Sequence, residues 1–439
     1  MKVFIETLGC PKNFNDSQVM KQNLIDNGYE LSSLPEEADI IVINTCGFIN
    51  DAKKESIDTI FDYAVYGKRL VVSGCLSERY SHDLAEEMPE VDLFLGVNEY
   101  DRISEIFDEH FAKGAGSESR EVVSHCYPKV LSKLPRKLED NPYSCTIKIA
   151  EGCNNRCAYC VIPDIRGGYR SKKFEDIISE AKELADAGCK ELILIAQDPT
   201  NYGKDLYGKF RFAELVHEVC KIDGIHWVRL MYCYEDKITD ELIEAMATEP
   251  KVCHYIDIPI QHASDNVLKG MYRHSTKESI INTISKLRAK VPDISIRTTL
   301  IVGFPGETDE DYEELLDFVN EQEFERLGVF AYSQEEGTPA GDRPDQIDED
   351  VKEERLDQIM RYQLEISFEH NQKMVGNTYE VLVEGLDEDG TSYIGRTQYD
   401  APEIDNSVIF TSGRDLKPGD FVNVKIVDAF DYDLVGVEI

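Results

Sequence analysis

Apolar residues recur along the first hundred positions in short runs that alternate with helical patterns. Four of these runs are rich in β-branched residues and end at or near glycine or cysteine, at 3–9, 39–45, 70–74 and 91–96. Segments between them, such as 16–27 and 51–63, carry apolar residues at helical spacing. Strands that alternate with helices form a parallel sheet covered by helices. The pattern therefore predicts an amino-terminal α/β domain with a doubly wound parallel sheet.

The alternation resumes after residue 141 and later changes to short strands. Six apolar strand candidates are separated by helices, at 144–150, 191–196, 227–232, 255–260, 294–302 and 327–332. Six strand–helix units predict a parallel barrel or partial barrel, with its chemistry at the carboxyl ends of the strands. A long charged helix is expected over 348–373. Short strands follow at 378–383, 393–397, 407–410 and 421–429, and they predict a small β-barrel.

These patterns divide the 439 residues into three domains and a linker. The first domain is expected over 1–111. Residues 112–141, with Gly, Ser, Pro and mixed charge, are expected to be a linker with one short strand near Val122. The central domain with its trailing helix is expected over 142–372, and the last domain over 373–439. The predicted class is α/β, with a doubly wound sheet, a (βα)6 partial TIM barrel and a small antiparallel β-barrel.

The composition is strongly acidic, with 47 Lys and Arg against 85 Asp and Glu and a net charge of −38. This charge argues against broad non-specific binding to nucleic acid and favours a basic partner. The first residues do not resemble a signal peptide, and no apolar run approaches the ~20 residues of a membrane span. We expect a cytoplasmic protein without a membrane partner. Its twelve cysteines are then expected to be metal ligands or core residues.

Cys153, Cys157 and Cys160 lie at C-x-x-x-C-x-x-C spacing directly after the first central strand. Soft thiolates at such short spacing suit an iron–sulfur cluster, and three ligands on four irons leave one iron open. A zinc knuckle is the alternative, but zinc usually needs a second Cys or His pair, and none follows. The trio resembles that of the radical S-adenosylmethionine enzymes. In that family the open iron binds S-adenosylmethionine, which is reductively cleaved to a 5′-deoxyadenosyl radical.

Cys10, Cys46 and Cys75 fall at the ends of the first three predicted strands, each beside a glycine. The carboxyl ends of parallel strands line one crevice, so these thiols are expected to converge there. Buried core cysteines are the alternative interpretation.

Other strand ends of the central domain supply candidates for binding S-adenosylmethionine. Gly303 and Gly306, in VGFPGET, close a strand and permit close backbone approach to a ligand. This string resembles the glycine-containing adenosine-contacting loop of radical S-adenosylmethionine enzymes, although a plain turn is an alternative. Gln197 and Gln261 offer hydrogen-bonding groups at the same rim, where ordinary strand-end capping would also explain them.

Arg166 and Arg170, in IRGGYRS, follow the central cysteines. They could balance the charge of clusters or of a carboxylate, and solvated surface arginines are equally plausible. No side chain is assigned a catalytic role, because clusters and S-adenosylmethionine would carry the chemistry.

The two cysteine sets, the order of the domains and several local strings resemble the methylthiotransferases. The strings are TLGCPKNFNDSQVM, INTCGFINDAKKES, KIAEGCNNRCAYCVIPDIRGGYRS and AQDPTNYGKDLYG. They are similar to the branch that modifies a small-subunit ribosomal protein, whereas the tRNA branch usually has Gln-Met after the first cysteine. Pro199 departs from the ribosomal-protein branch, which often carries Thr at this position.

The resemblance implies that Cys10, Cys46 and Cys75 hold a second 4Fe-4S cluster and that the last domain is a TRAM domain. It implies as substrate the β-carbon of an aspartate in small-subunit ribosomal protein twelve, which receives sulfur and a methyl group. One molecule of S-adenosylmethionine would methylate the sulfur, and another would supply the radical.

Residues 375–439 contain 14 acidic and 4 basic residues, a net charge of −10. This charge opposes RNA binding and would attract a basic ribosomal protein, free or in the ribosome. A solvated acidic surface without a partner is the alternative. An electron donor such as flavodoxin or ferredoxin is also expected.

Two rival functions stay open from the sequence. A tRNA adenosine methylthiotransferase would need a basic path, for which Lys129, Lys133, Arg136 and Lys137 are the best candidates. A non-catalytic iron–sulfur carrier would show no open iron and no cleavage of S-adenosylmethionine.

Overall fold

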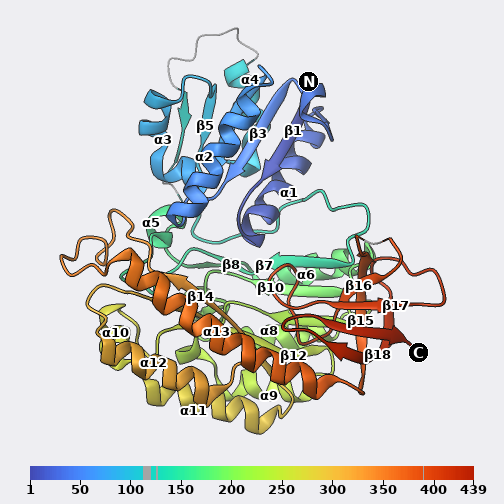
Figure 1. Ribbon diagram of the computed structural model, residues 1–439. Coiled ribbons are helices and arrows are strands. Elements are labelled where there is room, and N and C mark those ends of the chain that lie inside the picture. Colours follow the sequence, from blue (N-terminus) through green and yellow to red (C-terminus); the bar gives the residue numbers. More distant parts are fainter. Residues whose placement is uncertain (112–119, 125–126, 389) are drawn as a thin grey trace. The chain divides into compact units, whose positions relative to one another are not determined.

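The computed structural model describes residues 1–111, 120–124, 127–388 and 390–439, which form two compact units (Figure 1). Unit 1 comprises Met1–Asp140, Lys148–Ile177 and Glu335–Thr338. Unit 2 comprises Asn141–Ile147, Ile178–Gln334 and Pro339–Ile439. Residues 112–119 and 125–126 of the predicted linker lie outside the described residues, as does Asp389 of the predicted acidic barrel.

Unit 1 is built on a six-stranded sheet in the order β2-β1-β3-β4-β5-β6, and all of its ladders are parallel. Its strands are β1 (Lys2–Thr7), β2 (Glu30–Leu31), β3 (Ile40–Thr45), β4 (Arg69–Gly74), β5 (Leu93–Leu95) and β6 (Glu121–Val122). The short strand expected near Val122 is confirmed as β6, whereas the two-residue edge strand β2 was not predicted.

Helices cover both faces of this sheet. The helices are α1 (Pro11–Asp26), α2 (Asn50–Ala64), α3 (Cys75–Glu87) and α4 (Ile103–Phe111). Leu24 of α1 and Phe107 of α4 pack with Val42 in one apolar core, and Ile60 of α2 packs with Ile43 in another. Alternate side chains of each strand thus enter two different cores. The doubly wound sheet is confirmed.

The strand predicted over 144–150 is broken at Ile149. It forms β7 (Ser144–Lys148) and β8 (Ala150–Glu151), and β8 pairs antiparallel with β9 (Arg170–Ser171). The central cysteines and α5 (Ile162–Arg166) lie between β8 and β9 in the chain. Because β8 and β9 pair, the two ends of the segment between them lie side by side.

Unit 2 contains an open parallel sheet in the order β14-β13-β12-β11-β10-β7. Its further strands are β10 (Glu191–Ile195), β11 (Trp227–Leu230), β12 (Val252–Gln261), β13 (Ser295–Val302) and β14 (Arg326–Ala331). The order follows the chain from one edge to the other without closing, as a partial barrel requires. The six predicted strands and the (βα)6 partial barrel are confirmed.

The larger helices of this part are α6 (Phe174–Asp186), α8 (Phe212–Cys220), α9 (Asp240–Thr248), α11 (Lys277–Lys290), α12 (Asp309–Gln322) and α13 (Glu349–Met374). Shorter ones are α7 (Lys204–Tyr207) and α10 (Asp265–Gly270), and single 3-10 turns lie at Pro35–Glu37, Tyr100–Arg102, Pro199–Asn201 and Glu235–Lys237. Thr308 caps α12 by accepting a hydrogen bond from the backbone of Asp311, in a reciprocal capping box. The glycine-containing loop after β13 therefore enters α12 in a fixed direction.

The last domain is a closed five-stranded barrel in the order β15-β16-β17-β19-β18. The strands are β15 (Thr378–Leu386), β16 (Tyr393–Arg396), β17 (Val408–Thr411), β18 (Phe421–Ala429) and β19 (Leu434–Glu438). The predicted barrel is confirmed, but β19 was missed and the β17–β19 ladder is parallel. A closed ring with an odd number of strands cannot alternate in direction throughout, so one pair has to run parallel.

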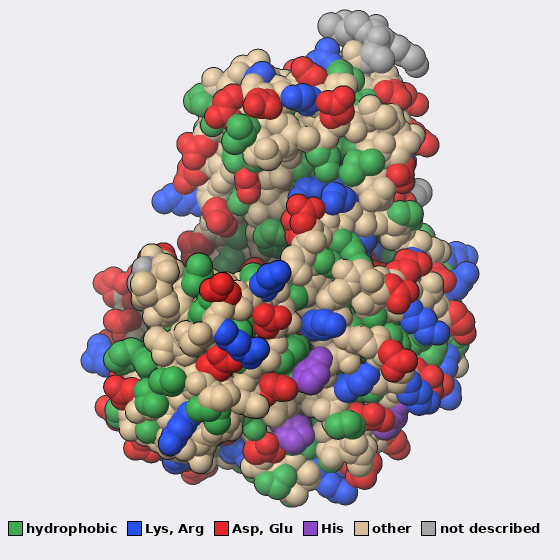
Figure 2. Space-filling view, turned by 90° about the vertical axis from the view of Figure 1, so that its right-hand side faces the viewer, with side chains coloured by type: hydrophobic (Ala, Val, Ile, Leu, Met, Phe, Trp, Pro, Cys, Tyr) green, Lys and Arg blue, Asp and Glu red, His purple; other side chains and the backbone are tan. Residues whose placement is uncertain are grey.

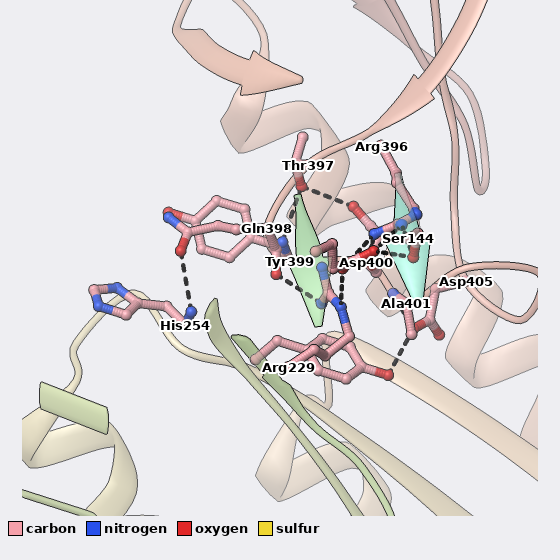
Figure 3. Close-up of polar contacts among 12 residues, drawn as sticks. Ser144, Arg229, His254, Arg396, Thr397, Gln398, Tyr399, Asp400, Ala401 and Asp405 are labelled. Carbon is pink, nitrogen blue, oxygen red and sulfur yellow. Dashed lines mark hydrogen bonds and ion pairs between the residues drawn. The ribbon is translucent and has the colours of Figure 1, made fainter. Parts of the chain in front are cut away.

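Buried ion pairs join this barrel to the sheet of unit 2 (Figure 3). Glu191, at the start of β10, accepts hydrogen bonds from Arg229 Nε at 2.8 Å, Arg396 Nη1 at 2.8 Å and Ser144 Oγ at 2.7 Å. Asp400 binds Arg326 Nη2 at 2.6 Å. Burial opposes ionisation of Glu191, but the guanidinium groups of Arg396 and Arg229 lower its pKa to about 2. The barrel and the sheet are thus fastened by compensated charges.

Candidate functional site

The first cysteine set lies at the carboxyl edge of the unit 1 sheet. Cys10 precedes α1 as its N-cap, Cys46 follows β3, and Cys75 opens α3. A Cβ on Gly9 would lie 2.8 Å from Cys46 Cβ, and one on Gly47 would lie 2.9 Å from the carbonyl carbon of Cys75. No real Cβ tolerates such contacts, so glycine is required for the segments to pack together. The structure brings the three cysteine segments to one edge.

The three thiols also act on one another electrostatically. Burial raises the pKa of Cys46 to about 11, and the neighbouring Cys75 and Cys10 add to that effect. Burial likewise raises the pKa of Cys75, although the positive charge of Arg166 acts to lower it. In the described ranges, no group of three or more His, Cys, Asp or Glu side chains, these cysteines included, is already arranged around a metal position.

The second cysteine set lies in the loop from β8 to α5. A Cβ on Gly152, whose φ is +79°, would lie 2.4 Å from the carbonyl oxygen of Gly168. Only glycine therefore allows the chain to turn into the cysteine loop at that point. Inside the loop, the Asn155 N–H donates to Cys153 Sγ at 3.5 Å and the Cys160 N–H donates to the Cys157 oxygen at 3.0 Å. One short, internally bonded loop carries all three thiols.

The donors of both sets fit an iron–sulfur cluster. Each set consists of three thiols, and burial raises the pKa of Cys75 and of Cys160 above the ordinary value. A buried thiolate is stabilised by a metal cation, which deprotonates the sulfur on binding. Cluster sites also direct hydrogen bonds at their sulfurs, as the backbone does here at Cys153. Their role as ligands stays a prediction.

The candidates for S-adenosylmethionine binding lie at the carboxyl ends of the unit 2 strands. Gln197 follows β10 and is half-buried, while Gln261 ends β12 with a φ of +72°. Gly303 and Gly306 follow β13 with φ values of +70° and +79°. The parallel sheet thus puts these residues on one edge, as expected for a ligand site.

Gly303 also has a packing reason, because a Cβ there would lie 2.2 Å from Lys352 Cγ. A Cβ on Gly306 would lie 2.4 Å from Nη2 at the movable end of the Arg343 side chain. Gly306 lines a cavity of about 320 Å³ together with Asn266, Val267, Lys269, Gly270, Phe304, Pro305 and Arg343. Ligand contact by the four predicted residues stays a prediction.

Glu307 fixes the conformation of this loop. Its side chain is buried, accepts a hydrogen bond from the Phe304 N–H at 3.2 Å and binds Arg355 Nη1 at 2.7 Å. Nε2 of the buried His262 lies 3.6 Å from the same carboxylate. Sequence reasoning did not find this role. The available signal was an acidic residue directly after the second glycine.

Arg166 and Arg170 are buried, so the prediction that they could be solvated surface arginines is wrong. Arg166 binds Asp16 Oδ2 at 2.7 Å, and Arg170 Nη1 donates to the carbonyl oxygen of Gly168 at 2.8 Å. Asp16, Lys148 and Glu151 were not predicted as site residues. A lysine inside an apolar strand and a glutamate before a cysteine loop were the signals that could have found the last two.

Three family models match the chain. They are "Radical SAM superfamily" over residues 147–319, "Uncharacterized protein family UPF0004" over residues 2–96, and "TRAM domain" over residues 375–439. The domain limits expected at 111, 141 and 372 remain predictions.

Curated relatives match nearly the whole chain. "Ribosomal protein uS12 methylthiotransferase RimO" of Acetivibrio thermocellus is 52% identical over 99% of this chain and 98% of its own. Proteins of the same name from Clostridioides difficile and Geobacter sulfurreducens are 50% and 46% identical, each over 99% of this chain and 98% of their own. The chain belongs to the ribosomal protein uS12 methylthiotransferase family. The predicted methylthiotransferase resemblance is therefore confirmed.

Solved structures resemble this family member in fold. The radical S-adenosylmethionine methyltransferase TsrM from Kitasatospora setae, with cobalamin and a [4Fe-4S] cluster bound, has a TM-score of 0.59 and 16% identity over 77% of each chain. OxsB, a cobalamin-dependent S-adenosylmethionine radical enzyme, has a TM-score of 0.53 and 13% identity over 82% of this chain and 56% of its own. At these identities the likeness supports the predicted fold alone. In the described part of the chain, no helix is long and apolar enough to span a membrane.

Proposed function

We propose that this protein is a radical S-adenosylmethionine enzyme that attaches a methylthio group to ribosomal protein uS12. The observation that carries this proposal is the identity of about half of all positions, over nearly the full length, to curated uS12 methylthiotransferases. The same relatives do not favour the tRNA adenosine alternative. The cofactors are two 4Fe-4S clusters and S-adenosylmethionine.

Each cysteine set has a separate role in this proposal. Cys153, Cys157 and Cys160 hold the cluster that binds S-adenosylmethionine, and Gln197, Gln261, Gly303 and Gly306 contact that molecule. Cys10, Cys46 and Cys75 hold the other cluster. When bound, the cofactors supply the electron, the radical, the sulfur site and the methyl group. The chain's own residues hold the sulfurs at two glycine-dependent sites, where Cys75 and Cys157 are buried and the other four cysteines are partly buried. The acceptor is the β-carbon of an aspartate.

The turn between β18 and β19 supports docking of a basic protein. Asp428, near the end of β18, and Asp431, in the turn, are exposed beside Phe430 and Tyr432, which are 57% and 42% exposed, and we name these four residues the acidic turn. Aromatic side chains with an acidic rim suit a basic protein surface. Figure 2 shows Lys and Arg intermixed with Asp and Glu on the face it draws, where an RNA-binding surface would gather basic residues.

The structure limits which acidic residues of the barrel can dock a partner. Asp400 and Asp405 are buried in ion pairs with Arg326 and Arg297, so they are occupied within unit 2. The acidic turn and the exposed Glu388 remain at the surface. We place the reaction in the cytoplasm, with flavodoxin or ferredoxin as the electron donor.

The function is tested by anaerobic reconstitution with iron and sulfide, followed by incubation with a reductant, S-adenosylmethionine and purified uS12 or tRNA. Mass spectrometry is expected to find a methylthio group on one aspartate of uS12 and none on tRNA. If 5′-deoxyadenosine forms while uS12 stays unmodified, the substrate assignment is wrong. A methylthio group on tRNA adenosine would establish the alternative.

Docking is tested separately by reversing charge in the acidic turn. Asp428→Lys with Asp431→Lys is expected to raise the KM for uS12 roughly 3–10-fold at low salt and to flatten its salt dependence. Glu313→Lys with Asp317→Lys makes the same charge change at exposed positions of α12 and serves as the control. Equal KM values for the two double variants would remove the docking role of the acidic turn.

A further inference from the structure

Four charged side chains are buried together in unit 1. Asp16, Lys148, Glu151 and Arg166 are each at most 4% exposed. Lys148 Nζ contacts Asp16 Oδ1 and lies 2.6 Å from Glu151 Oε2, while Arg166 Nη1 lies 2.7 Å from Asp16 Oδ2. The two cations and two carboxylates compensate one another. A buried ion that lost its partner would be strongly destabilising.

This charged cluster connects the two cysteine sets. Asp16 lies in α1, which begins directly after Cys10, and Glu151 ends β8, two residues before Cys153. Arg166 ends α5, which follows the central cysteines. Movement of one cysteine loop relative to the other would therefore break buried ion pairs.

Arg166 also reaches a sulfur of the first cysteine set. Its Nη2 donates to Cys75 Sγ at 3.4 Å and to Asn13 Oδ1 at 2.7 Å. Nδ2 of Asn13 donates to the carbonyl oxygens of Leu8 and Thr45, each at 3.0 Å. The guanidinium is thus held by a carboxylate on one nitrogen and by a fixed amide on the other. Because the guanidinium is planar and rigid, these contacts orient its Nη2 group toward the Cys75 thiol.

Hydrogen bonds and positive charge at a ligand sulfur stabilise the reduced form of an iron–sulfur cluster, because that form carries more negative charge. They therefore raise the reduction potential of the cluster. A residue that supplies both from outside the ligand set acts on the cluster without binding iron.

We propose that Arg166 is a positioning residue for the cluster at Cys10, Cys46 and Cys75, which orients the Cys75 sulfur and raises the reduction potential of that cluster. The inference rests on the proposed function, because it takes these cysteines as ligands. It adds that the environment of the first cluster is completed by the segment that carries the second. Asp16, with Lys148 and Glu151 behind it, holds the guanidinium in place.

The test isolates the first cluster in a full-length background with Cys153→Ala, Cys157→Ala and Cys160→Ala. Arg166→Gln removes the charge and the hydrogen bond and is expected to shift the midpoint potential to a more negative value, measured by anaerobic titration with visible and electron paramagnetic resonance detection. Arg166→Lys keeps the charge but not the fork, so a smaller shift in the same direction is expected, with iron content unchanged. Arg166→Lys also keeps the proposal testable if Arg166→Gln does not fold.

Arg170→Gln is the matched control. Arg170 is also buried, but its Nη1 donates to the carbonyl oxygens of Arg166 and Gly168, and its guanidinium lies over the Tyr127 ring at 4.8 Å. It is expected to shift the potential less than Arg166→Gln does.

An unchanged potential and spectrum in both Arg166 variants would overturn the inference and leave the proposed function standing. If the background with Arg166 intact binds no cluster, the assignment of Cys10, Cys46 and Cys75 falls as well.

Discussion

The buried arginines of unit 1 and unit 2 bind carboxylates in similar ways, but they contact different parts of the chain. In unit 2, Arg229 and Arg396 bind Glu191 and join the strands β10 and β11 to the C-terminal barrel. In unit 1, Arg166 binds Asp16 and also donates to Cys75. The presence of a thiol near a buried arginine does not by itself distinguish the two networks. Arg229 acts electrostatically on Cys253, which packs in an apolar core with Ile193 and Tyr255.

Burial of charge therefore does not by itself indicate a functional site. In both networks each ion is compensated, which is what allows it to be buried. What separates them is the neighbouring chemistry. The unit 2 network ends on backbone and barrel residues, and the unit 1 network ends on a candidate ligand sulfur. Substitutions in the two networks can separate a role in stabilising the fold from a role in setting the potential of a cluster.

The largest effect on stability is expected for Glu191→Gln. This change removes the carboxylate bound to Arg229 and leaves Arg396 with Glu384 alone, so it is expected to lower the free energy of unfolding by roughly 3–5 kcal/mol. Trp227, the sole tryptophan of the sequence, packs edge-on against Phe421 at 4.9 Å and reports on this region by fluorescence in urea. A loss below about 1 kcal/mol, the range of exposed ion pairs, would contradict the fastening role.

The same carboxylate predicts an acid-dependent loss of stability. The folded-state pKa of Glu191, about 2, lies below the ordinary value of 4.5, so its contribution is complete above about pH 4.5 and is lost as the pH falls toward 2. The loss is expected to be roughly 3 kcal/mol. Urea unfolding followed at Trp227 should show the decline in the natural protein. Glu191→Gln should show a flatter profile, and parallel profiles would contradict the assignment.

A smaller effect is expected for Asp16→Asn in unit 1. Lys148 and Arg166 lose one carboxylate but keep Glu151 as a neighbour, so the local stability is expected to fall by about 1.5–3 kcal/mol. Hydrogen exchange measured by mass spectrometry should rise in α1 and in α5, while the Trp227 transition stays in place. The first cluster should also shift to a more negative potential. Faster exchange with an unshifted potential would show that this network stabilises the fold but does not set the potential of the cluster.

The smallest effect is expected for Lys286→Ala. Lys286 Nζ lies 2.8 Å from Asp240 Oδ1, but both side chains are more than half exposed. Removing the lysine is expected to change the free energy of unfolding by less than about 1 kcal/mol. A change as large as that of Glu191→Gln would show that burial does not separate these ion pairs.

The sequence predicted the strands and helices well, because buried parallel strands are continuous apolar runs. It missed β19, whose LVGVE follows an acidic turn and contains a glycine, and it missed the break at Ile149. Both cysteine sets were readable from their spacing or from their position at strand ends. The environment of Arg166 was not, because its partner Asp16 lies 150 positions away and only the folded chain joins them.

The most direct test of the account compares the natural protein with two triple variants under the anaerobic conditions above. With Cys10, Cys46 and Cys75 changed to alanine, 5′-deoxyadenosine is expected to form while uS12 receives no methylthio group. With Cys153, Cys157 and Cys160 changed to alanine, neither product is expected. If the first variant still modifies uS12, the two-cluster account is contradicted.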